Sequence, residues 1–336
     1  MIPFSVLDLA PITKGSQPRD ALARSRRLAT HADRLGYNRY WLAEHHNMPG
    51  IASAATAVMI AHAGQDTENI RLGAGGIMLP NHAPIMVAEQ FGTLEAIYPG
   101  RIDLGLGRAP GGDQAVAHAL RRTLIGGEDR FPKEVVELQA FLDDVQPGQR
   151  VQAVPGGGTK IPLWILGSST FGAQLAAHLG LPYAFASHFA PQQMERAVSI
   201  YRQTFQPSEQ LKAPYVMLGF NLIAADTDAE AERLAWSQKQ TFVNLRRGMP
   251  TQLAPPDPSF GAEIKPHEHT MLEQTLRCSA IGSRETVKQQ LETFIAETGA
   301  DELIMSSHIY DETARHRSYE IAAEVRESLS TPKAAE

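Results

Sequence analysis

The stretch WLAEHHNMPG, residues 41–50, ends an apolar run in one carboxylate, Glu44, and two imidazoles, His45 and His46. An imidazole changes charge near neutral pH, so either histidine is suited to donate or accept a proton in a reaction. Neighbouring residues of a strand point to opposite faces, so only one of the two imidazoles is expected to face a site at the strand's end. For the same reason a metal ion shared by the two is disfavoured. The remaining alternative is a histidine that only makes hydrogen bonds within the fold.

A second group of residues is suited to bind an anion. In the stretch WILGSSTFG, Ser168 and Ser169 follow an apolar run and directly precede a predicted helix. The free N–H groups and the dipole of a helix N-terminus attract anions, and the hydroxyls add donors, although ordinary capping is the alternative. Arg108 ends the preceding apolar run, and its guanidinium is suited to phosphate. An ion pair of Arg108 with Glu44 or Asp103 is the competing interpretation.

Glycines are unusually frequent in two consecutive predicted strands, at positions 73, 75, 76, 105 and 107. Glycine weakens a strand because it packs no side chain, so these positions favour a flat ligand lying against the main chain. Tight packing inside the fold is the alternative. Neither stretch fits the dinucleotide fingerprint G-x-G-x-x-G, and the sequence has no Walker A, G-x-S-x-G or H-E-x-x-H motif. The motifs therefore favour neither a Rossmann nucleotide site nor hydrolysis by covalent or zinc chemistry.

Short apolar runs that alternate with helical patterns must position these groups. Strands are predicted at 4–10, 40–45, 70–79, 101–109, 162–169, 183–189, 215–225 and 302–309. Helices are predicted at 21–35, 53–65, 84–97, 171–179, 192–205, 228–245, 283–298 and 312–329. Eight strands alternating with helices predict an α/β fold, a (β/α)8 TIM barrel, with a doubly wound open sheet as the alternative. In such a barrel the carboxyl ends of the strands carry the functional residues, and both groups above occupy such positions.

We expect one barrel domain over residues 1–336, with insertions at about 110–161 and 248–270 that are candidate lids. The sequence HEH, residues 267–269, is expected in a solvated loop of the second insertion. The net charge of −6 gives no reason to expect a nucleic-acid partner, and the single cysteine, Cys278, excludes an internal disulfide. No secretory signal or membrane span is predicted, so a cytoplasmic protein with no membrane partner is expected.

Three longer stretches together resemble the bacterial luciferase-like, flavin-dependent monooxygenases. They are YWLAEHHNMPG, RLGAGGIMLPNHAPIMVAEQFGTLEAIYPGRIDLGLGRAPGG and WILGSSTFGAQLAAHLGLPYAFASHFAP, and the resemblance covers roughly positions 3 to 330. It implies a luciferase-like barrel with an insertion, often a homodimer. It also implies a monooxygenase that takes reduced FMN from a separate flavin reductase and uses O2 to oxygenate a small organic substrate.

The resemblance further implies a role for individual residues. His45 corresponds to the catalytic imidazole beside the flavin ring. Ala74 and Gly75 correspond to a strand segment that lies against the ring and that contains a non-proline cis peptide in some relatives. Gly107 corresponds to a position near the reactive flavin carbon and Arg108 to the phosphate-binding arginine. The remaining cofactor-binding positions belong to the phosphate loop: Gly167, Ser168, Ser169 and Phe171.

Two departures from luciferase itself bear on the activity. Luciferase has Glu at the position of Ser168 and Ala-Ala in place of Gly75-Gly76, which argues against light emission and a long-chain aldehyde substrate. Two other functions stay open at this point. One is an F420- or NAD(P)H-dependent hydride-transfer oxidoreductase on the same barrel, and the other is a non-catalytic flavin-binding protein. The organic substrate is not identified by any motif.

Overall fold

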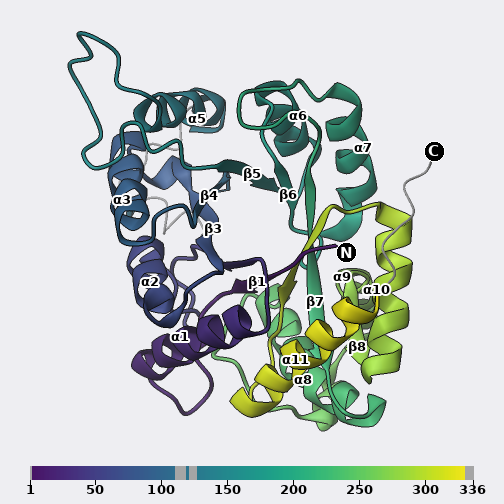
Figure 1. Ribbon diagram of the computed structural model, residues 1–336. Helices are drawn as coiled ribbons and strands as arrows, with labels where there is room; N and C mark the ends of the chain where they lie inside the picture. Colours follow the sequence, from purple (N-terminus) through teal and green to yellow (C-terminus); the bar gives the residue numbers. More distant parts are fainter. Residues whose placement is uncertain (1, 110–118, 121–126, 330–336) are drawn as a thin grey trace.

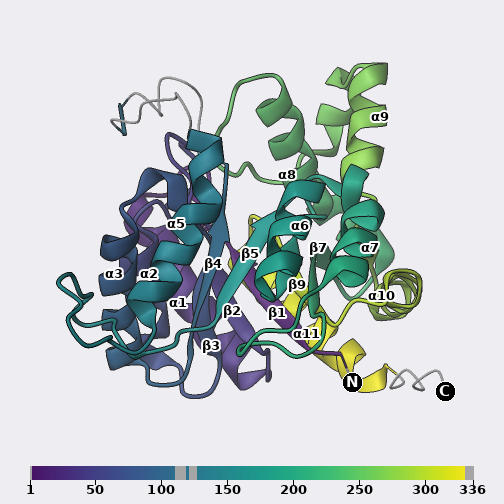
Figure 2. The ribbon, with the colours of Figure 1, turned by 90° about the horizontal axis from the view of Figure 1, so that it is seen from above.

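Eight parallel strands close into a barrel in the computed structural model of the chain, which describes residues 2–109, 119–120 and 127–329. Helices surround this barrel on the outside (Figures 1 and 2). Each strand pairs with the next, and the last closes the ring by pairing with the first. The predicted (β/α)8 barrel is therefore confirmed, and the open-sheet alternative is wrong.

The barrel strands follow the predicted order, with small differences in length. In the order of pairing they are β1 (Phe4–Asp8), β2 (Arg39–Leu42), β3 (Arg71–Met78), β4 (Ile102–Gly107), β5 (Leu163–Gly167), β6 (Tyr183–Phe185), β7 (Val216–Ala224) and β9 (Glu302–Ser306). Because β2 already ends at Leu42, the Glu-His-His sequence follows the strand and does not form its last residues. A short strand that was not predicted, β8 (Ser279–Gly282), pairs with the second half of β7 outside the closed ring.

The described helices are α1 (Pro18–Arg34), α2 (Thr56–Ala63), α3 (Pro84–Ile97), α5 (Gly127–Leu142), α6 (Thr170–Leu179), α7 (Met194–Thr204), α8 (Asp228–Arg246), α9 (Pro266–Thr275), α10 (Arg284–Thr298) and α11 (Glu312–Ser328). Short 3-10 helices are η1 (Gly64–Asp66), η2 (Leu79–Asn81), η3 (Pro191–Gln193) and η4 (Pro258–Glu263). In the described part of the chain, no helix is both long and apolar enough to cross a lipid bilayer.

Two of these helices, α5 and α9, lie inside the predicted insertions, where no helix was expected. α5 packs against α3 as the outer helix between β4 and β5. α9 packs against α8, and the expectation of a solvated loop at 267–269 is wrong because these residues are helical. Within this segment Glu268 is buried and pairs with Arg247, whose Nε lies 2.7 Å from Oε1 of Glu268. Most of the first insertion before α5 lies outside the described residues.

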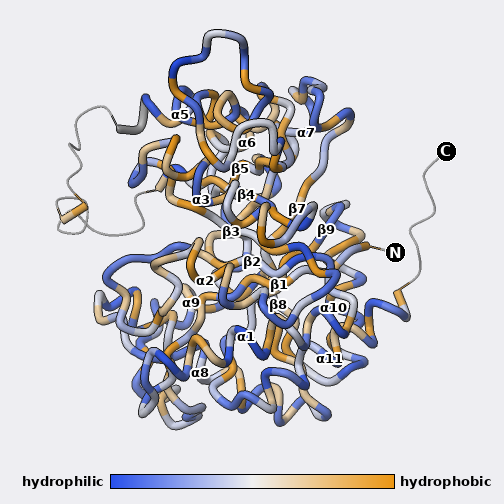
Figure 3. The backbone as a smooth tube through the Cα atoms, turned by 60° about the vertical axis from the view of Figure 1, so that its left-hand side comes forward, coloured by the Kyte–Doolittle hydropathy of each residue, from blue (hydrophilic) through white to orange (hydrophobic). Residues whose placement is uncertain are grey.

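Local sequence explains why the outer helices form where they do. α1 begins with Pro18 in its first turn, and it buries residues at helical spacing, including Ala21, Leu28 and Ala32. The chain leaves this helix through Gly36, whose φ of 69° favours glycine. The other face of such a helix is polar, and in Figure 3 the tube changes repeatedly between blue and orange along the outer helices.

The core has two layers, one between the barrel and its helices and one inside the barrel. The inner layer contains Trp41, Trp164 and Met217, and all three side chains are buried. The two indoles meet edge to face with 5.2 Å between their ring centroids. Such a packed interior leaves no pore through the barrel, so a ligand site must lie at one of its ends.

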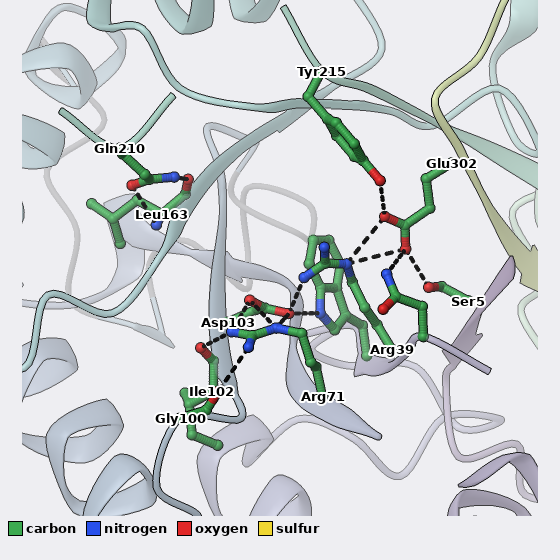
Figure 4. Close-up of polar contacts among 12 residues, drawn as sticks. Ser5, Arg39, Arg71, Gly100, Ile102, Asp103, Leu163, Gln210, Tyr215 and Glu302 are labelled. Carbon is green, nitrogen blue, oxygen red and sulfur yellow. Dashed lines mark hydrogen bonds and ion pairs between the residues drawn. The ribbon is translucent and has the colours of Figure 1, made fainter. Parts of the chain in front are cut away.

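An ion network closes the amino-terminal end of the barrel (Figure 4). Arg39 places Nη1 2.6 Å from Oδ2 of Asp103 and Nε 3.1 Å from Oε1 of Glu302. Arg71 places Nη2 2.7 Å from Oδ1 of Asp103. Asp103 therefore pairs with arginines near the start of β4 and not with Arg108, which follows the end of that strand. The opposite, carboxyl-terminal end remains for chemistry.

Candidate active site

A cavity of about 370 Å³ lies at the carboxyl ends of the strands. Its walls come from the segments that follow β1, β2, β6 and β9, from β3, and from the end of α8 with the chain beyond it. The lining residues are Leu7, Leu9, Pro11, Ala43, His45, Met48, Gly50, Ile51, Gly75, Ala186, His188, Phe189, Thr241, Phe242, Leu245, Pro250, Thr251, Leu253 and His308. This volume falls in the lower part of the range of pockets that bind small molecules.

Main-chain hydrogen bonds hold one wall of this cavity together. The N–H of Leu253 donates to the carbonyl of Ile12 at 2.9 Å, and the N–H of Ile12 donates to the carbonyl of Gly50 at 2.9 Å. A Cβ at residue 50 would collide with the carbonyl of Thr251, so glycine permits this close approach. The first residues of the second predicted lid, 250–253, are thus attached to the loops after β1 and β2.

Glu44 joins the end of β2 to the end of β3. Its carboxylate lies 2.7 Å from Nε2 of His46 and 2.9 Å from Nε2 of His82, and it accepts the N–H of Met78 at 3.0 Å. Burial raises the pKa of Glu44, but these hydrogen bonds and the charge of His82 outweigh burial and lower the pKa overall. The carboxylate therefore stays ionised at neutral pH and fixes His46 beside it.

His45 takes the other direction and lines the cavity. Burial lowers the pKa of His45, while the main chain of Ala43 and the charge of Glu44 oppose this effect only in part. Within the described residues its Nδ1 has no hydrogen-bond partner. The structure thus distinguishes the two adjacent imidazoles: His45 is neutral and faces the cavity, whereas His46 is bound to a carboxylate.

Two further histidines line the same cavity and were not among the predicted site residues. His188 follows β6, and His308 follows β9. Burial, together with the neighbouring His308 and His45, lowers the pKa of His188 to about 4. Burial and the charge of Arg315 lower the pKa of His308 to about 4. Both lie in the last residues of predicted strands, 183–189 and 302–309, and that position was the available signal for them.

The predicted phosphate-binding residues come together at the ends of β4 and β5. The guanidinium carbon of Arg108 lies 4.2 Å from the ring centroid of Phe171, in the first turn of α6. Ser168 is exposed, and Ser169 occupies the N-cap position without a capping hydrogen bond from its side chain. Ser168 and Ser169 thus belong to the same turn into α6 as Phe171, on whose ring Arg108 stacks. None of these residues lines the cavity.

The glycines divide into those that packing explains and those that it does not. A Cβ on Gly73 would lie 2.6 Å from the carbonyl oxygen of Asp103, and one on Gly76 would lie 2.7 Å from that of Gly105. Barrel packing therefore requires these positions to be small. A Cβ on Gly107 would meet no atom closer than 3.8 Å.

The remaining predicted residues of β3 and β5 differ in what they present. Gly75 lines the cavity, and the Gly75–Gly76 peptide bond is cis. Ala74 is fully buried, and its side chain packs into the outer core. A Cβ on Gly167 would have its nearest neighbour at 3.8 Å, so this position is as open as Gly107.

Over residues 2–109, 119–120 and 127–329, no group of three or more His, Cys, Asp or Glu side chains is arranged to hold a metal ion. The barrel and the cavity at its carboxyl-terminal end, with a neutral imidazole in its lining, are typical of an enzyme of the TIM-barrel class. The chain belongs to the luciferase-like monooxygenase family, whose sequence profile matches residues 2–302.

Two relatives by sequence support this assignment. The chain is 51% identical over 328 residues to a luciferase-like monooxygenase of Escherichia coli (strain K12), and the match covers 98% of each chain. It is 36% identical over 257 residues to the N-acetyl-S-alkylcysteine monooxygenase of Bacillus subtilis (strain 168), which covers 74% of this chain and 75% of that one. The chain is therefore an oxidoreductase of the monooxygenase type.

Solved structures agree with the fold. The crystal structure of apo-MsnO8 matches with a TM-score of 0.89 and 36% identity, over 98% of this chain and 100% of that chain. The oxygenating constituent of 3,6-diketocamphane monooxygenase from Pseudomonas putida, in complex with FMN, matches with a TM-score of 0.73, 18% identity and 99% coverage of both chains. An F420-dependent secondary alcohol dehydrogenase matches with a TM-score of 0.70 and 17% identity, over 98% of this chain and 99% of that one. The last two likenesses concern the fold alone.

Proposed function

We propose that this chain is an FMN-dependent monooxygenase that uses reduced FMN and O2 to oxygenate a small organic molecule. The observation that carries the proposal is the position of Arg108, stacked on Phe171 at the N-terminus of α6, at the same carboxyl-terminal end of the barrel as the cavity that holds His45. One end of the site is suited to an anion and the other to a flat apolar ring.

The residues fit the two ends of a flavin mononucleotide. The guanidinium of Arg108, the hydroxyls of Ser168 and Ser169, and the first N–H groups of α6 would hold the phosphate. The main chain at Gly107 and Gly167 is open, as a cofactor lying close to the backbone would require. On this proposal Gly75 presents main chain to the ring, the buried Ala74 supports it from within β3, and Phe171 supports the arginine.

Bound reduced FMN would supply the electrons with which O2 is activated. The chain's own contribution is to hold the cofactor, to exclude water and to move a proton. The cavity is lined mainly by apolar side chains, which disfavour water near the ring. His45 is neutral at pH 7 and its Nδ1 is unpartnered within the described chain, so we assign it the catalytic role of accepting or donating the proton.

The choice between FMN and F420 can be tested by titration without a substrate. The protein is titrated with FMN, riboflavin and F420 while tryptophan fluorescence is followed, and Trp41 and Trp164 lie inside the barrel. We expect FMN to bind at least tenfold more tightly than either alternative. Tighter binding of F420 would contradict the proposal and favour hydride transfer. Binding of FMN without any oxygenated product, in a broad substrate screen with an added reductase, would favour a non-catalytic flavin-binding protein.

A separate flavin reductase and a homodimer belong to the same proposal. Both come from the family resemblance, and neither is needed for the binding experiment above. Light scattering measures the oligomeric state directly, and a mass of one chain would contradict the dimer. A generic NADH-dependent FMN reductase, added in trans, tests whether free reduced FMN supports turnover.

A further inference from the structure

We propose that the cavity selects an uncharged, largely apolar substrate whose single hydrogen-bonding group is held by His188 and His308, next to His45. The inference rests on the proposed function, because it treats the part of the cavity around His188 and His308, beyond the ring at Gly75, as the substrate site of the monooxygenase. It goes beyond that function by naming the chemical class of the substrate and two specificity-determining residues.

The first step concerns the charge of the lining. Among the described residues, those that line the cavity are mainly aliphatic and aromatic, and they include no Asp, Glu, Lys or Arg. An ionised carboxylate or ammonium group without a partner is strongly disfavoured in such surroundings. Arg246 follows Leu245 of the lining, is exposed and stacks on the ring of Phe189, with 5.8 Å between the guanidinium carbon and the ring centroid. Its charge is therefore solvated, and the cavity favours a neutral molecule.

The second step concerns the polar groups that remain. Besides two threonines, the polar side chains of the lining are His45, His188 and His308. Burial keeps the last two neutral at physiological pH, with pKa values of about 4. A neutral imidazole offers one N–H donor and one acceptor nitrogen. These residues suit a carbonyl, hydroxyl, thioether or amide group, none of which needs a counter-charge.

The third step concerns the fixed position of His188. The side-chain amide of Asn221 donates to the main-chain carbonyl of His188 at 2.8 Å, and Gln238 donates to Oδ1 of Asn221 at 2.5 Å. A Cβ at Gly219 would collide with Nδ1 of His188, so the imidazole lies directly over this glycine of β7. Within the described residues this Nδ1 has no hydrogen-bond partner. The Nδ1 edge of the ring thus lies buried against β7, so the opposite edge, which carries Nε2, is the one available to a ligand in the cavity.

His308 is placed from the other side of the cavity. Its Nδ1 lies 3.5 Å from Oγ of Ser306, the last residue of β9. The charge of Arg315 opposes protonation of His308, and Arg315 is itself paired with Asp8, with 2.9 Å between Nη2 and Oδ1. His308 is therefore held as a neutral hydrogen-bonding group beside His188 and His45.

The experiment compares three six-carbon probes of similar shape: hexan-2-one, hexanoate and hexylammonium. Their dissociation constants are measured at pH 7.5 by saturation-transfer NMR, on the apoprotein and on the FMN-loaded protein. We expect hexan-2-one to bind at least tenfold more tightly than either ion. Equal or tighter binding of an ion, or no binding of hexan-2-one up to its solubility, would overturn the proposal.

Variants test the two histidines. His188→Leu and His308→Leu are expected to weaken hexan-2-one binding at least fivefold while FMN affinity changes less than twofold. His188→Gln, which keeps a neutral donor and acceptor, should recover part of the loss. Gly219→Ala keeps the imidazole of His188 but displaces it, and this variant should weaken the binding of hexan-2-one to a similar extent. The control is His269→Leu, which replaces an exposed histidine of α9. It should leave the affinities for hexan-2-one and FMN unchanged.

The outcomes separate this inference from the proposed function. Failure of the wild-type protein to bind FMN would defeat the proposed function, while the apoprotein comparison would still report the preference of the cavity. Normal ketone binding by both leucine variants would defeat the inference and leave FMN binding untouched. Thermal unfolding of each variant identifies any that fails to fold, and Gly219→Ala then serves as the independent test of His188.

Discussion

The two adjacent imidazoles after β2 differ in their surroundings, and this difference predicts different effects on catalysis. His45→Ala should retain FMN affinity within about twofold, because the phosphate group is bound elsewhere. Oxygenation should fall about 100-fold or more, since a positioned acid or base typically contributes about 10²–10⁴. The measurement is oxygenated product formed per reduced FMN consumed, with a substrate identified by screening. Normal oxygenation by this variant would remove His45 from catalysis.

His46 provides the matched control for that experiment. It lies one residue away, but its Nε2 contacts the carboxylate of Glu44 and it does not line the cavity. His46→Ala should therefore lower oxygenation less than tenfold. If both alanine variants lost activity equally, the shared effect would point to the loop after β2 as a whole and not to one proton-transfer group.

Arg108 is predicted to discriminate between FMN and riboflavin, which differ by the phosphate. Arg108→Ala should weaken FMN binding about 10–100-fold, because a hydrogen bond to a charged group contributes about 1.5–3 kcal/mol. Riboflavin binding should change less than threefold. The control is Arg101→Ala, which removes an arginine at the opposite end of the same strand. Equal losses for both ligands in the Arg108 variant would argue against a phosphate contact.

At this scale the sequence predicted residue types and approximate places, but not orientations. Strand alternation implied that only one of His45 and His46 faces the site. It could not tell which of the two does so, because β2 ends before them. His188 and His308 could have been found from their positions at the ends of predicted strands. What no local pattern contained was their mutual proximity, which depends on the pairing of β7 with both β6 and β9.

At the scale of elements, the eight barrel strands and the helices outside the two insertions were predictable from periodicity. The missed helix α5 has apolar residues that become buried at helical spacing: Phe131, Val135, Leu138 and Leu142. Its internal Pro132 obscured this pattern, since proline usually ends a helix. α9 was missed because its flanks are rich in proline and polar residues. Its packing against α8 is tertiary, through Phe242, Ile264 and Leu272, and leaves little periodicity in the sequence.

One buried ion pair connects several elements around the site. Asp8 ends β1, and its carboxylate accepts from Ser25 of α1 at 2.5 Å and from Arg315 of α11 at 2.9 Å, and it also bonds Tyr40 of β2. Burial raises the pKa of Asp8, but the charge of Arg315 and these hydrogen bonds outweigh burial and lower it. Arg315→Leu should reduce the free energy of unfolding by about 3–5 kcal/mol, because it leaves a buried carboxylate unpaired.

Urea unfolding measures this loss, and Arg317→Leu is the control on the same helix. Arg317 is partly exposed and pairs with Asp226 and Glu324 at the surface, so its replacement should cost less than about 1 kcal/mol. Similar losses of unfolding free energy for both variants would show that the buried Asp8–Arg315 pair stabilises the fold no more than a surface ion pair does.

For the whole molecule, the two ends of the barrel are expected to separate stability from function. Asp103→Asn at the amino-terminal end weakens the pairing of Arg39 and Arg71 (Figure 4). It should lower the free energy of unfolding by about 3–5 kcal/mol, as expected for a broken buried ion network, and leave FMN affinity within twofold. Arg108→Ala should weaken FMN binding and leave the free energy of unfolding nearly unchanged. A variant at the amino-terminal end that abolished FMN binding without loss of stability would contradict this separation.

The neutral histidines of the cavity also predict how stability depends on pH. The pKa values of His188 and His308 are lowered from 6.5 to about 4 in the folded protein. Between these values the unfolded chain binds more protons than the folded one, so stability falls as the pH is lowered through this window and is fully present above it. Each imidazole should cost about 2 kcal/mol between pH 7 and pH 5. The carboxyls of Asp8 and Glu44 have lowered pKa values, so their contribution is lost mainly below this range.

The contribution of the two imidazoles can be isolated by urea unfolding at pH 7 and pH 5. The wild-type protein is compared with the His188→Leu, His308→Leu double variant. The wild-type protein should lose more stability than the double variant over that interval, by about 2–4 kcal/mol, because two coupled imidazoles do not take up protons independently. His269→Leu, on the exposed face of α9, should keep the wild-type dependence. Equal losses of unfolding free energy in the wild-type protein and the double variant would mean that these imidazoles titrate alike in the folded and unfolded chains. The cavity would then be too hydrated to exclude a charged substrate.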